Sequence, residues 1–252
     1  MSYEMLATSQ TPALIIYALD VSGSMSILMD NNKKRVEVVT DALYVALQQM
    51  VFRSTKGGRV APRYRLAMFA YSDEVYDVLG GIKTIDQVAA MGVPELKALR
   101  ATNTAKVFAH IEQLLQSELP NLASCPAPLV CHMTDGEYNG DNPEPIIRRI
   151  MSMGNPDGNV LVENIFISER ILPQEVGSPE EWAGVSLETP LRNRYAKKLR
   201  DMSSPIPASY RVMMLEQGYQ IGEDALMLLP GESPELIEMG FAMSMSTPTS
   251  AQ

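Results

Sequence analysis

A short apolar run that ends in three oxygen-bearing side chains constrains this chain more than any other feature. Residues 13–19 read A-L-I-I-Y-A-L, and they are followed by Asp20, Ser22 and Ser24. The run is too short to cross a membrane and suits a strand that is buried on both faces of a sheet. The polar residues then fall just past the carboxyl end of that strand, where open α/β sheets bind their ligands. The alternative is a plain polar turn in which Ser22 or Ser24 caps the next helix.

The chemistry of these side chains favours a hard divalent cation. One carboxylate and two hydroxyls offer oxygen ligands, which suit Mg²⁺ or Ca²⁺ and suit Zn²⁺ or Cu poorly. Gly23 permits a tight backbone turn, so both hydroxyls can face one point. The rest of the chain has to decide between the metal site and the polar turn.

Length and charge narrow the class of protein. The chain has 252 residues, enough for one large α/β domain with insertions, and its two cysteines are too few for a disulfide framework. No stretch is long and apolar enough to cross a membrane, and residues 1–10 do not look like a signal peptide. These features predict a cytoplasmic protein. The formal net charge of −9 argues against nucleic acid as a partner, because phosphate binding requires a basic surface.

Strands and helices are expected to alternate along the chain. Further strands are predicted at residues 64–71, 129–133, 160–167 and 225–229, with residues 74–79 as a short antiparallel partner at the sheet edge. Helices are predicted from a cap at residues 30–32 to about residue 52, and at about 85–90, 94–99, 100–119, 145–153, 189–202, 205–217 and 233–243. This order predicts an α/β fold with a Rossmann-like, doubly wound, mostly parallel central sheet and helices on both faces.

The whole chain, residues 1–252, is expected to form a single domain. Its core is expected at about residues 13–243, and the polar residues 244–252 would form a tail. Residues 169–187 contain two prolines, two glycines and the only Trp, and are interpreted as an inserted loop. No internal repeat or linker between domains is visible.

Two other segments carry side chains that could join the first cluster. Thr102 and Thr104 lie at the start of a predicted helix, and Asp135 follows the strand predicted at residues 129–133. Parallel strands place their carboxyl ends on one edge of the sheet, so loops far apart in sequence can meet there.

The three segments together resemble the von Willebrand factor A (VWA) domain and its metal-ion-dependent adhesion site (MIDAS). The family's D-x-S-x-S motif is matched at residues 20–24, its threonine segment at 101–104, and its T-D-G segment at 134–136. The resemblance covers at least residues 13–167. It departs from the family at residues 100–101, R-A, where glycines are common.

The resemblance implies a metal site and a binding function. By analogy with the family, the metal ligands would be Asp20, Ser22, Ser24, Thr102 and Asp135. The cation would be Mg²⁺, with Mn²⁺ or Ca²⁺ as alternatives. In the family one coordination position accepts an Asp or Glu carboxylate from a partner protein, and no bond is broken, so the resemblance implies a binding module and not an enzyme.

The resemblance also implies a cellular setting. Among relatives, the chain looks most like compact cytoplasmic bacterial members, including those linked to tellurium resistance. Such members often occur beside protein kinases and PP2C-type phosphatases. A signalling or stress-response assembly with a kinase or phosphatase partner is therefore expected.

Enzymatic alternatives rest on the same residues. A serine hydrolase would need a base near Ser22 or Ser24, but His110 lies in a predicted helix and His132 within a predicted strand. An aspartyl phosphotransferase would use Asp20 as nucleophile, yet Ser22 stands where such enzymes usually need a second acid. A metal-dependent hydrolase or phosphatase using the same site stays open as the alternative function.

The inserted loop at residues 169–187 is the predicted source of partner specificity, with Trp182 as the leading contact. Trp is enriched among interface hot spots, and the loop exceeds what a simple connection requires. If the preceding strand is parallel to the first, the loop emerges at the edge that carries the metal. The alternative is that Trp182 folds back and covers the end of the sheet.

Overall fold

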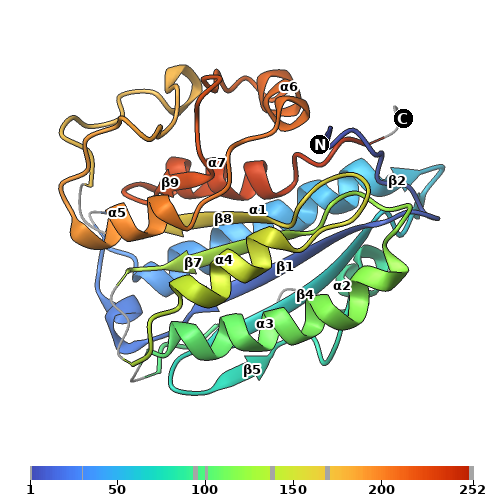
Figure 1. The fold of residues 1–252 in the computed structure, drawn as a ribbon, viewed down its shortest axis with the longest axis horizontal. Coiled ribbons are helices and arrows are strands. Elements are labelled where there is room, and N and C mark those ends of the chain that lie inside the picture. Colours follow the sequence, from blue (N-terminus) through green and yellow to red (C-terminus); the bar gives the residue numbers. More distant parts are fainter. Residues whose placement is uncertain are drawn as a thin grey trace.

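A seven-stranded sheet organises the part of the chain that the structure describes. The computed structural model describes residues 2–29, 31–92, 96–99, 102–136, 140–167 and 171–249. The strands lie in the order β5-β4-β1-β7-β8-β9, and β6 also pairs with β4 (Figure 1). Their bounds are β1 (Ala13–Asp20), β4 (Tyr64–Tyr71), β5 (Val75–Asp77), β6 (Lys83–Thr84), β7 (Leu129–Thr134), β8 (Leu161–Phe166) and β9 (Leu228–Pro230). A separate two-stranded ribbon joins β2 (Thr55–Lys56) to β3 (Arg59–Val60).

The direction of the strands confirms the predicted α/β class. Strands β4, β1, β7, β8 and β9 pair in parallel, whereas β5 and β6 run antiparallel to β4 at the edge. Along the chain, β1 is followed first by β4 on one side and later by β7 on the other. The order of strands therefore reverses at β1, and such a reversal opens a crevice at the carboxyl ends of the strands.

Helices cover both faces of the sheet. Helices α1 (Arg35–Ser54), α6 (Ala208–Glu216) and α7 (Pro234–Ser244) pack on one face, with α2 (Ile85–Met91) beside α1. The opposite face carries α3 (Thr104–Glu118), α4 (Glu144–Ser152) and α5 (Arg194–Asp201), and Figure 1 shows α3 and α4 in front of the sheet. Three short 3-10 turns are η1 (Gly23–Ser26), η2 (Leu119–Asn121) and η3 (Pro179–Glu181). None of the helices within the described ranges has the length and apolarity needed to cross a bilayer.

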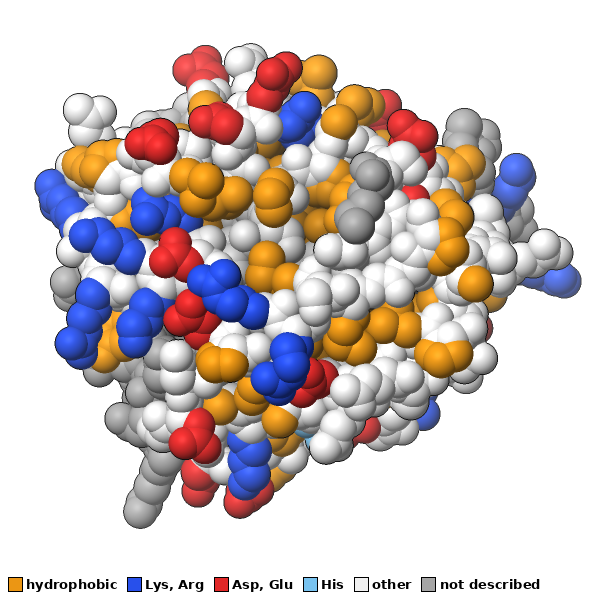
Figure 2. Space-filling model, viewed as in Figure 1, with side chains coloured by type: hydrophobic (Ala, Val, Ile, Leu, Met, Phe, Trp, Pro, Cys, Tyr) orange, Lys and Arg blue, Asp and Glu red, His pale blue; other side chains and the backbone are white. Residues whose placement is uncertain are grey.

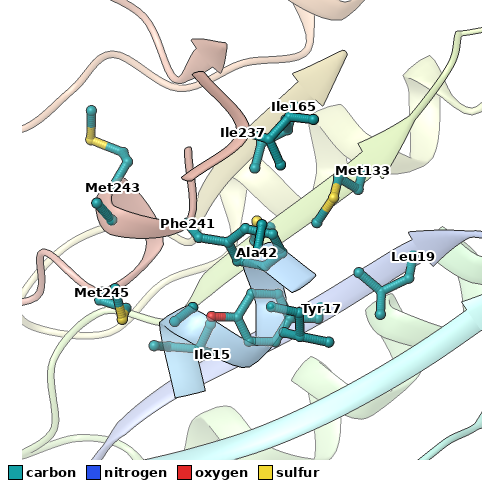
Figure 3. Close-up of a cluster of buried hydrophobic side chains, with 14 of the residues drawn as sticks. Ile15, Tyr17, Leu19, Ala42, Met133, Ile165, Ile237, Phe241, Met243 and Met245 are labelled. Atoms are coloured by element: carbon teal, nitrogen blue, oxygen red, sulfur yellow. The ribbon is translucent and has the colours of Figure 1, made fainter. Parts of the chain in front are cut away.

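Strand β1 is buried along its whole length, which explains its continuous apolar sequence. Alternate residues enter opposite clusters: Tyr17 and Leu19 join the cluster under α1 and α7, whereas Ile16 and Ala18 join the cluster under α3 and α4. Figure 3 shows Tyr17 beside Phe241 of α7, and their ring centroids are 5.9 Å apart. The strand that carries the candidate site is thus fixed by packing on both faces.

Helix α1 begins later than the sequence predicts. It starts at Arg35, because the residues before it bond to one another outside any helix: the Arg35 amide bonds to the Ile27 carbonyl at 3.0 Å, and the Met29 amide bonds to the Lys33 carbonyl at 2.9 Å. The Glu37 side chain accepts the Lys34 amide at 2.8 Å and closes the helix terminus. Of the predicted caps at residues 30–32, Asp30 lies outside the described residues, and neither Asn31 nor Asn32 is at the cap position.

Two other predicted helices also differ from the structure. Helix α5 begins at Arg194 instead of residue 189, because the Asn193 side chain accepts the Tyr195 amide, while Thr189 bonds to Ser186 in the preceding turn. Residues 96–99 are not helical, and residues 93–95 of that predicted piece lie outside the described residues. Local side-chain hydrogen bonds set the start of α5, whereas the Leu99 amide bonds to the distant Val21 carbonyl and not to a helical partner.

The segment after α7 packs onto the body. Ser246 and Thr247 are buried, the Thr247 hydroxyl lies 2.8 Å from Tyr210 Oη, and Thr249 pairs with Ala7 near the other terminus. The side chains of Ser244, Ser246 and Thr247 therefore have hydrogen-bond partners inside the fold.

Candidate metal centre

Two of the predicted ligand segments leave adjacent parallel strands at the same edge. Strands β1 and β7 are paired in register, with Leu19 opposite Met133. Asp20 and Asp135 follow these two residues closely, and both side chains are buried. This pairing places the loops that follow β1 and β7 next to each other at the sheet edge.

Hydrogen bonds fix both oxygens of the Asp20 carboxylate. The Ser22 amide donates to Oδ1 at 2.8 Å, and the Thr134 hydroxyl donates to Oδ2 at 2.8 Å. The first bond closes the turn after β1, and the second links the ends of β1 and β7. The carboxylate is therefore held in one orientation by the protein itself.

The two serines after β1 point their hydroxyls at one another. Ser22 Oγ and Ser24 Oγ are 3.1 Å apart, across the turn at Gly23 that begins η1. Ser22 is buried, whereas Ser24 is partly exposed. Two hydroxyl oxygens this close together can contact one cation, as the spacing of the motif predicts.

The threonine segment is tied to the loops that follow β1 and β4. The Asn103 amide bonds to the Ser72 carbonyl at 2.7 Å, and the Leu99 amide bonds to the Val21 carbonyl at 2.5 Å. Thr102 is buried next to Asn103, which caps α3 by accepting the Lys106 amide. Arg100 and Ala101, where the sequence departs from the family pattern, lie outside the described residues.

Gly136 is required by the turn after β7. Its φ is +95°, and a Cβ at this position would lie 2.1 Å from Cε2 of the Phe166 ring. Any larger residue would therefore displace either the phenyl ring or the loop. The T-D-G segment thus sets the position of Asp135 through the close approach of its glycine to β8.

The two buried carboxylates at this edge of the sheet, Asp20 and Asp135, favour the binding of positive charge. The pKa of Asp20 is raised to about 6, chiefly by burial and also by the nearby Asp135 carboxylate, while the hydrogen bonds from Ser22 and Thr134 oppose the shift. Arg35 approaches Asp135, with Nη1 and Oδ2 3.2 Å apart. Two carboxylates that share a buried edge are costly without positive charge.

The donor set fits a hard divalent cation. Across the described ranges, no group of three or more His, Cys, Asp or Glu side chains is placed to hold a metal ion, so a site here would depend on hydroxyl oxygens. Oxygen-only coordination with retained water is typical of Mg²⁺. Asp20, Ser22, Ser24, Thr102 and Asp135 are the residues that could supply it.

Comparison with known proteins yields structural neighbours. No protein-family model and no curated protein sequence matches this chain. The PilB minor pilin from Streptococcus sanguinis aligns over 94% of this chain and 62% of that chain, with a TM-score of 0.54 and 10% identity. PTMP1 from the mussel byssus, in a structure with a zinc-occupied MIDAS motif, covers 62% and 38%, with a TM-score of 0.42 and 20% identity. The SpRpn10 VWA domain covers 64% and 77%, with a TM-score of 0.42 and 15% identity.

These similarities concern the fold alone. Structural neighbours include VWA-domain proteins, and the likeness to PilB extends over nearly all of this chain. The chain spans 38% of the PTMP1 structure and 62% of PilB. What the neighbours bind is a property of those proteins.

A buried polar chain runs beneath the site and accounts for one histidine. Tyr71 Oη lies 2.7 Å from His132 Nε2, and His132 Nδ1 lies 2.8 Å from Asn164 Oδ1. Burial lowers the pKa of His132 to about 4, although the hydrogen bond to Asn164 opposes the shift. Both ring nitrogens have partners inside the fold, so His132 is structural here, as the sequence analysis inferred.

Trp182 is partly buried on the loop that follows β8. Its side chain is half-buried and packs against members of both core clusters. It also lines an open pocket with Leu172, Glu175 and Glu181. Both the cover over the sheet end and the contact with a partner therefore stay predictions.

Sequence reasoning assigned no role to two residues that the structure places at the site, Thr134 and Arg35. Thr134 belongs to the T-D-G segment, and its hydroxyl both donates to Asp20 and accepts the Gly136 amide at 3.0 Å. Its polar side chain at the end of an apolar strand was the available signal. Arg35 gave no signal, because its partner Asp135 is 100 residues away in sequence.

Proposed function

We propose that this protein is a VWA-type binding module that holds one divalent cation at the carboxyl edge of its sheet and captures a carboxylate of a partner protein. One observation carries the proposal: two serine hydroxyls 3.1 Å apart lie next to the buried carboxylate of Asp20, and a second carboxylate, that of Asp135, is close enough to raise the pKa of Asp20. The hydroxyls offer ligands without charge, and the two carboxylates offer the charge that a cation needs.

The roles of the side chains follow from their positions. Asp20, Ser22, Ser24, Thr102 and Asp135 would hold the cation. Thr134 orients Asp20 through its 2.8 Å hydrogen bond, and Gly136 orients Asp135. The bound cation supplies a coordination position for an Asp or Glu carboxylate of the partner. Mg²⁺ is the proposed cation, with Mn²⁺ or Ca²⁺ able to replace it.

The surface charge supports an acidic partner. The chain carries a net charge of −9, yet five of its 21 basic residues fall between positions 192 and 200, a stretch without an acidic residue. Just before α5, the Arg192 amide bonds to the carbonyl of Ile171, which follows β8 in the chain. This bond holds the start of α5 near the carboxyl end of β8. Figure 2 shows Lys and Arg side chains gathered on the side where α5 lies in Figure 1. Complementary charge would steer an acidic partner toward this edge.

The absence of catalysis is also part of the proposal. His132 has partners on both ring nitrogens, and the His110 ring lies edge-on to Phe69 with centroids 4.8 Å apart. Neither arrangement supplies a base to Ser22 or Ser24. A phosphatase assay with Mg²⁺ that shows turnover, lost on Asp20→Ala, would favour the hydrolase alternative instead.

The cellular setting is proposed from the sequence resemblance. The protein is proposed to act in the bacterial cytoplasm, in a signalling or stress-response assembly like those of tellurium-resistance-associated members. A protein kinase or a PP2C-type phosphatase is the proposed class of partner, and Trp182 is the proposed second contact.

Partner capture in Mg²⁺ and in chelator tests the proposal. The immobilised wild-type protein should retain its partner in Mg²⁺ and release it in EDTA. Asp20→Ala should fail to retain it in either buffer. Asp73→Ala is the matched control, because Asp73 is an exposed acid after the neighbouring strand β4 and should behave as wild type. Equal retention with and without Mg²⁺ would refute metal-dependent capture.

A further inference from the structure

Arg35 reaches from the first residue of α1 into the candidate metal centre. Its Nη1 lies 3.2 Å from Asp135 Oδ2, and the two side chains are 14% and 3% exposed. The pair is therefore mostly shielded from water. A buried ion pair is screened far less than one at the surface. Arg35 thus places a positive charge against Asp135, one of the two carboxylates of the site.

The location of Arg35 is unfavourable for the helix itself. The amino terminus of a helix carries partial positive charge, so a basic residue in the first turn is disfavoured. Lys33 and Lys34 precede Arg35, which adds like charge at the same terminus. Helix stability thus gives no reason for an arginine here, whereas the contact with Asp135 does.

The backbone of Arg35 is anchored to the same turn that carries the serines. Its amide bonds to the Ile27 carbonyl at 3.0 Å, and the Ile27 amide bonds to the Ser24 carbonyl at 3.0 Å. The side chain can therefore leave Asp135 while the helix terminus stays in place. A cation could therefore replace the Arg35 side chain at Asp135 without rearrangement of the fold.

We infer that Arg35 is an internal counter-ion of the metal centre, which neutralises Asp135 in the metal-free protein and is displaced when a cation binds. The inference rests on the proposed function and adds a regulatory part to it. A guanidinium and a divalent cation repel each other at this range, and both compete for the same carboxylate. Arg35 therefore lowers the affinity for the cation and sets the concentration at which the site fills.

The opposite role is a clear alternative. If Arg35 served only to orient Asp135 toward the cation, its removal would loosen the site and weaken cation binding. The two roles thus predict opposite signs for the same substitution. The sign of the change in affinity decides between them.

Calorimetric titration of metal-free protein with Mn²⁺ and Mg²⁺ tests the inference. Arg35→Gln should bind about tenfold more tightly than wild type, because one positive charge beside the cation is removed. Arg35→Lys should stay within about threefold of wild type, because the charge is kept. Lys33→Gln is the matched control: it removes one charge at the same helix terminus, but Lys33 pairs with Asp41 at 2.7 Å and is exposed, so its affinity should change less than twofold.

Each outcome bears on a different claim. Unchanged or weaker binding by Arg35→Gln, with normal binding by wild type, would overturn the counter-ion role and leave the metal site standing. No uptake by wild type would overturn both.

A measurement on the wild type alone guards against a variant that fails to fold. On addition of Mg²⁺, the Arg35 Nε–H signal in the NMR spectrum should move toward that of an exposed arginine and exchange faster with water. An unchanged Arg35 signal at saturating Mg²⁺ would overturn the displacement.

Discussion

The Thr134 hydroxyl donates a 2.8 Å hydrogen bond to Asp20 Oδ2, across 114 positions of sequence. It joins the carboxyl ends of β7 and β1 and leaves Asp20 buried with its orientation set. Because the orientation exists before any cation arrives, binding need not order this carboxylate, which favours affinity. The same preformed geometry keeps a charged carboxylate buried near Asp135, which lowers the free energy of unfolding by an amount that can be measured.

Asp20→Asn is expected to stabilise the metal-free protein. A folded-state pKa of about 6, against the ordinary 3.8, means that stability falls as the pH rises from about 4 to about 6 and that the whole cost is present at pH 7.5. The shift corresponds to roughly 3 kcal/mol, of which the amide should recover at least about 1 kcal/mol. Urea unfolding in EDTA at pH 7.5 measures this, with Asp73→Asn as the exposed control. A loss of stability in Asp20→Asn would contradict the proposed cost of burying the Asp20 charge.

Asn164→Ala is expected to destabilise the fold and spare the metal centre. Asn164 Oδ1 accepts a hydrogen bond from His132 Nδ1 at 2.8 Å, and its Nδ2 donates to Ser203 Oγ at 2.9 Å and to the Met202 carbonyl at 3.1 Å. Its removal leaves buried polar groups without partners, which should cost roughly 2–4 kcal/mol. Thermal unfolding gives the loss, and Mn²⁺ titration should give an affinity near that of wild type. A large loss of affinity would mean that the chain beneath the site positions the ligands.

Glu163 provides a test of pH dependence away from the site. It is fully buried, and within the described part of the chain its two oxygens have no N–H or O–H donor, although the Cys131 thiol lies beside them. Burial raises the pKa of this carboxyl well above its usual range, so the folded state holds the proton more tightly than the unfolded state. Stability should therefore decrease as the pH rises above about 4.5.

Glu163→Gln should remove this dependence because an amide does not ionise. The difference in the free energy of unfolding between Glu163→Gln and wild type should grow in favour of the variant from pH 5 to pH 8. Urea unfolding at both pH values measures it. A difference that stays constant with pH would show that Glu163 is ionised in the fold or titrates normally.

Trp182→Ala is expected to lower stability by roughly 2 kcal/mol, because the side chain packs against both core clusters. Thermal unfolding checks the packing, and partner capture by the same variant checks the proposed contact. An unchanged melting temperature with reduced capture would show that recognition, and not packing, is the main role of Trp182.

The sequence predicted the strands of the site well because their signal is local. A strand buried on both faces must be apolar throughout, and β1 and β7 are. The D-x-S-x-S and T-D-G segments were placed correctly because each follows such a strand directly.

The starts of helices and the contacts between distant residues were harder to predict. Thr189 and Asn193 are both acceptable caps, and the hydrogen bond between Thr189 and Ser186 decides between them. The Arg35–Asp135 and Thr134–Asp20 contacts depend on how α1, β1 and β7 are placed in space. No pattern within a short window of sequence carries that information.

Cation uptake by Ser22→Ala/Ser24→Ala, compared with wild type, tests the central claim most directly. Calorimetric titration of metal-free wild type with Mg²⁺ should give one site per chain, and the double variant should lose it, because both hydroxyl ligands are removed while the buried strands are untouched. Circular dichroism should be the same for both proteins. Absence of Mg²⁺ and Mn²⁺ uptake by wild type, or equal uptake by the double variant, would contradict a metal centre at this edge of the sheet.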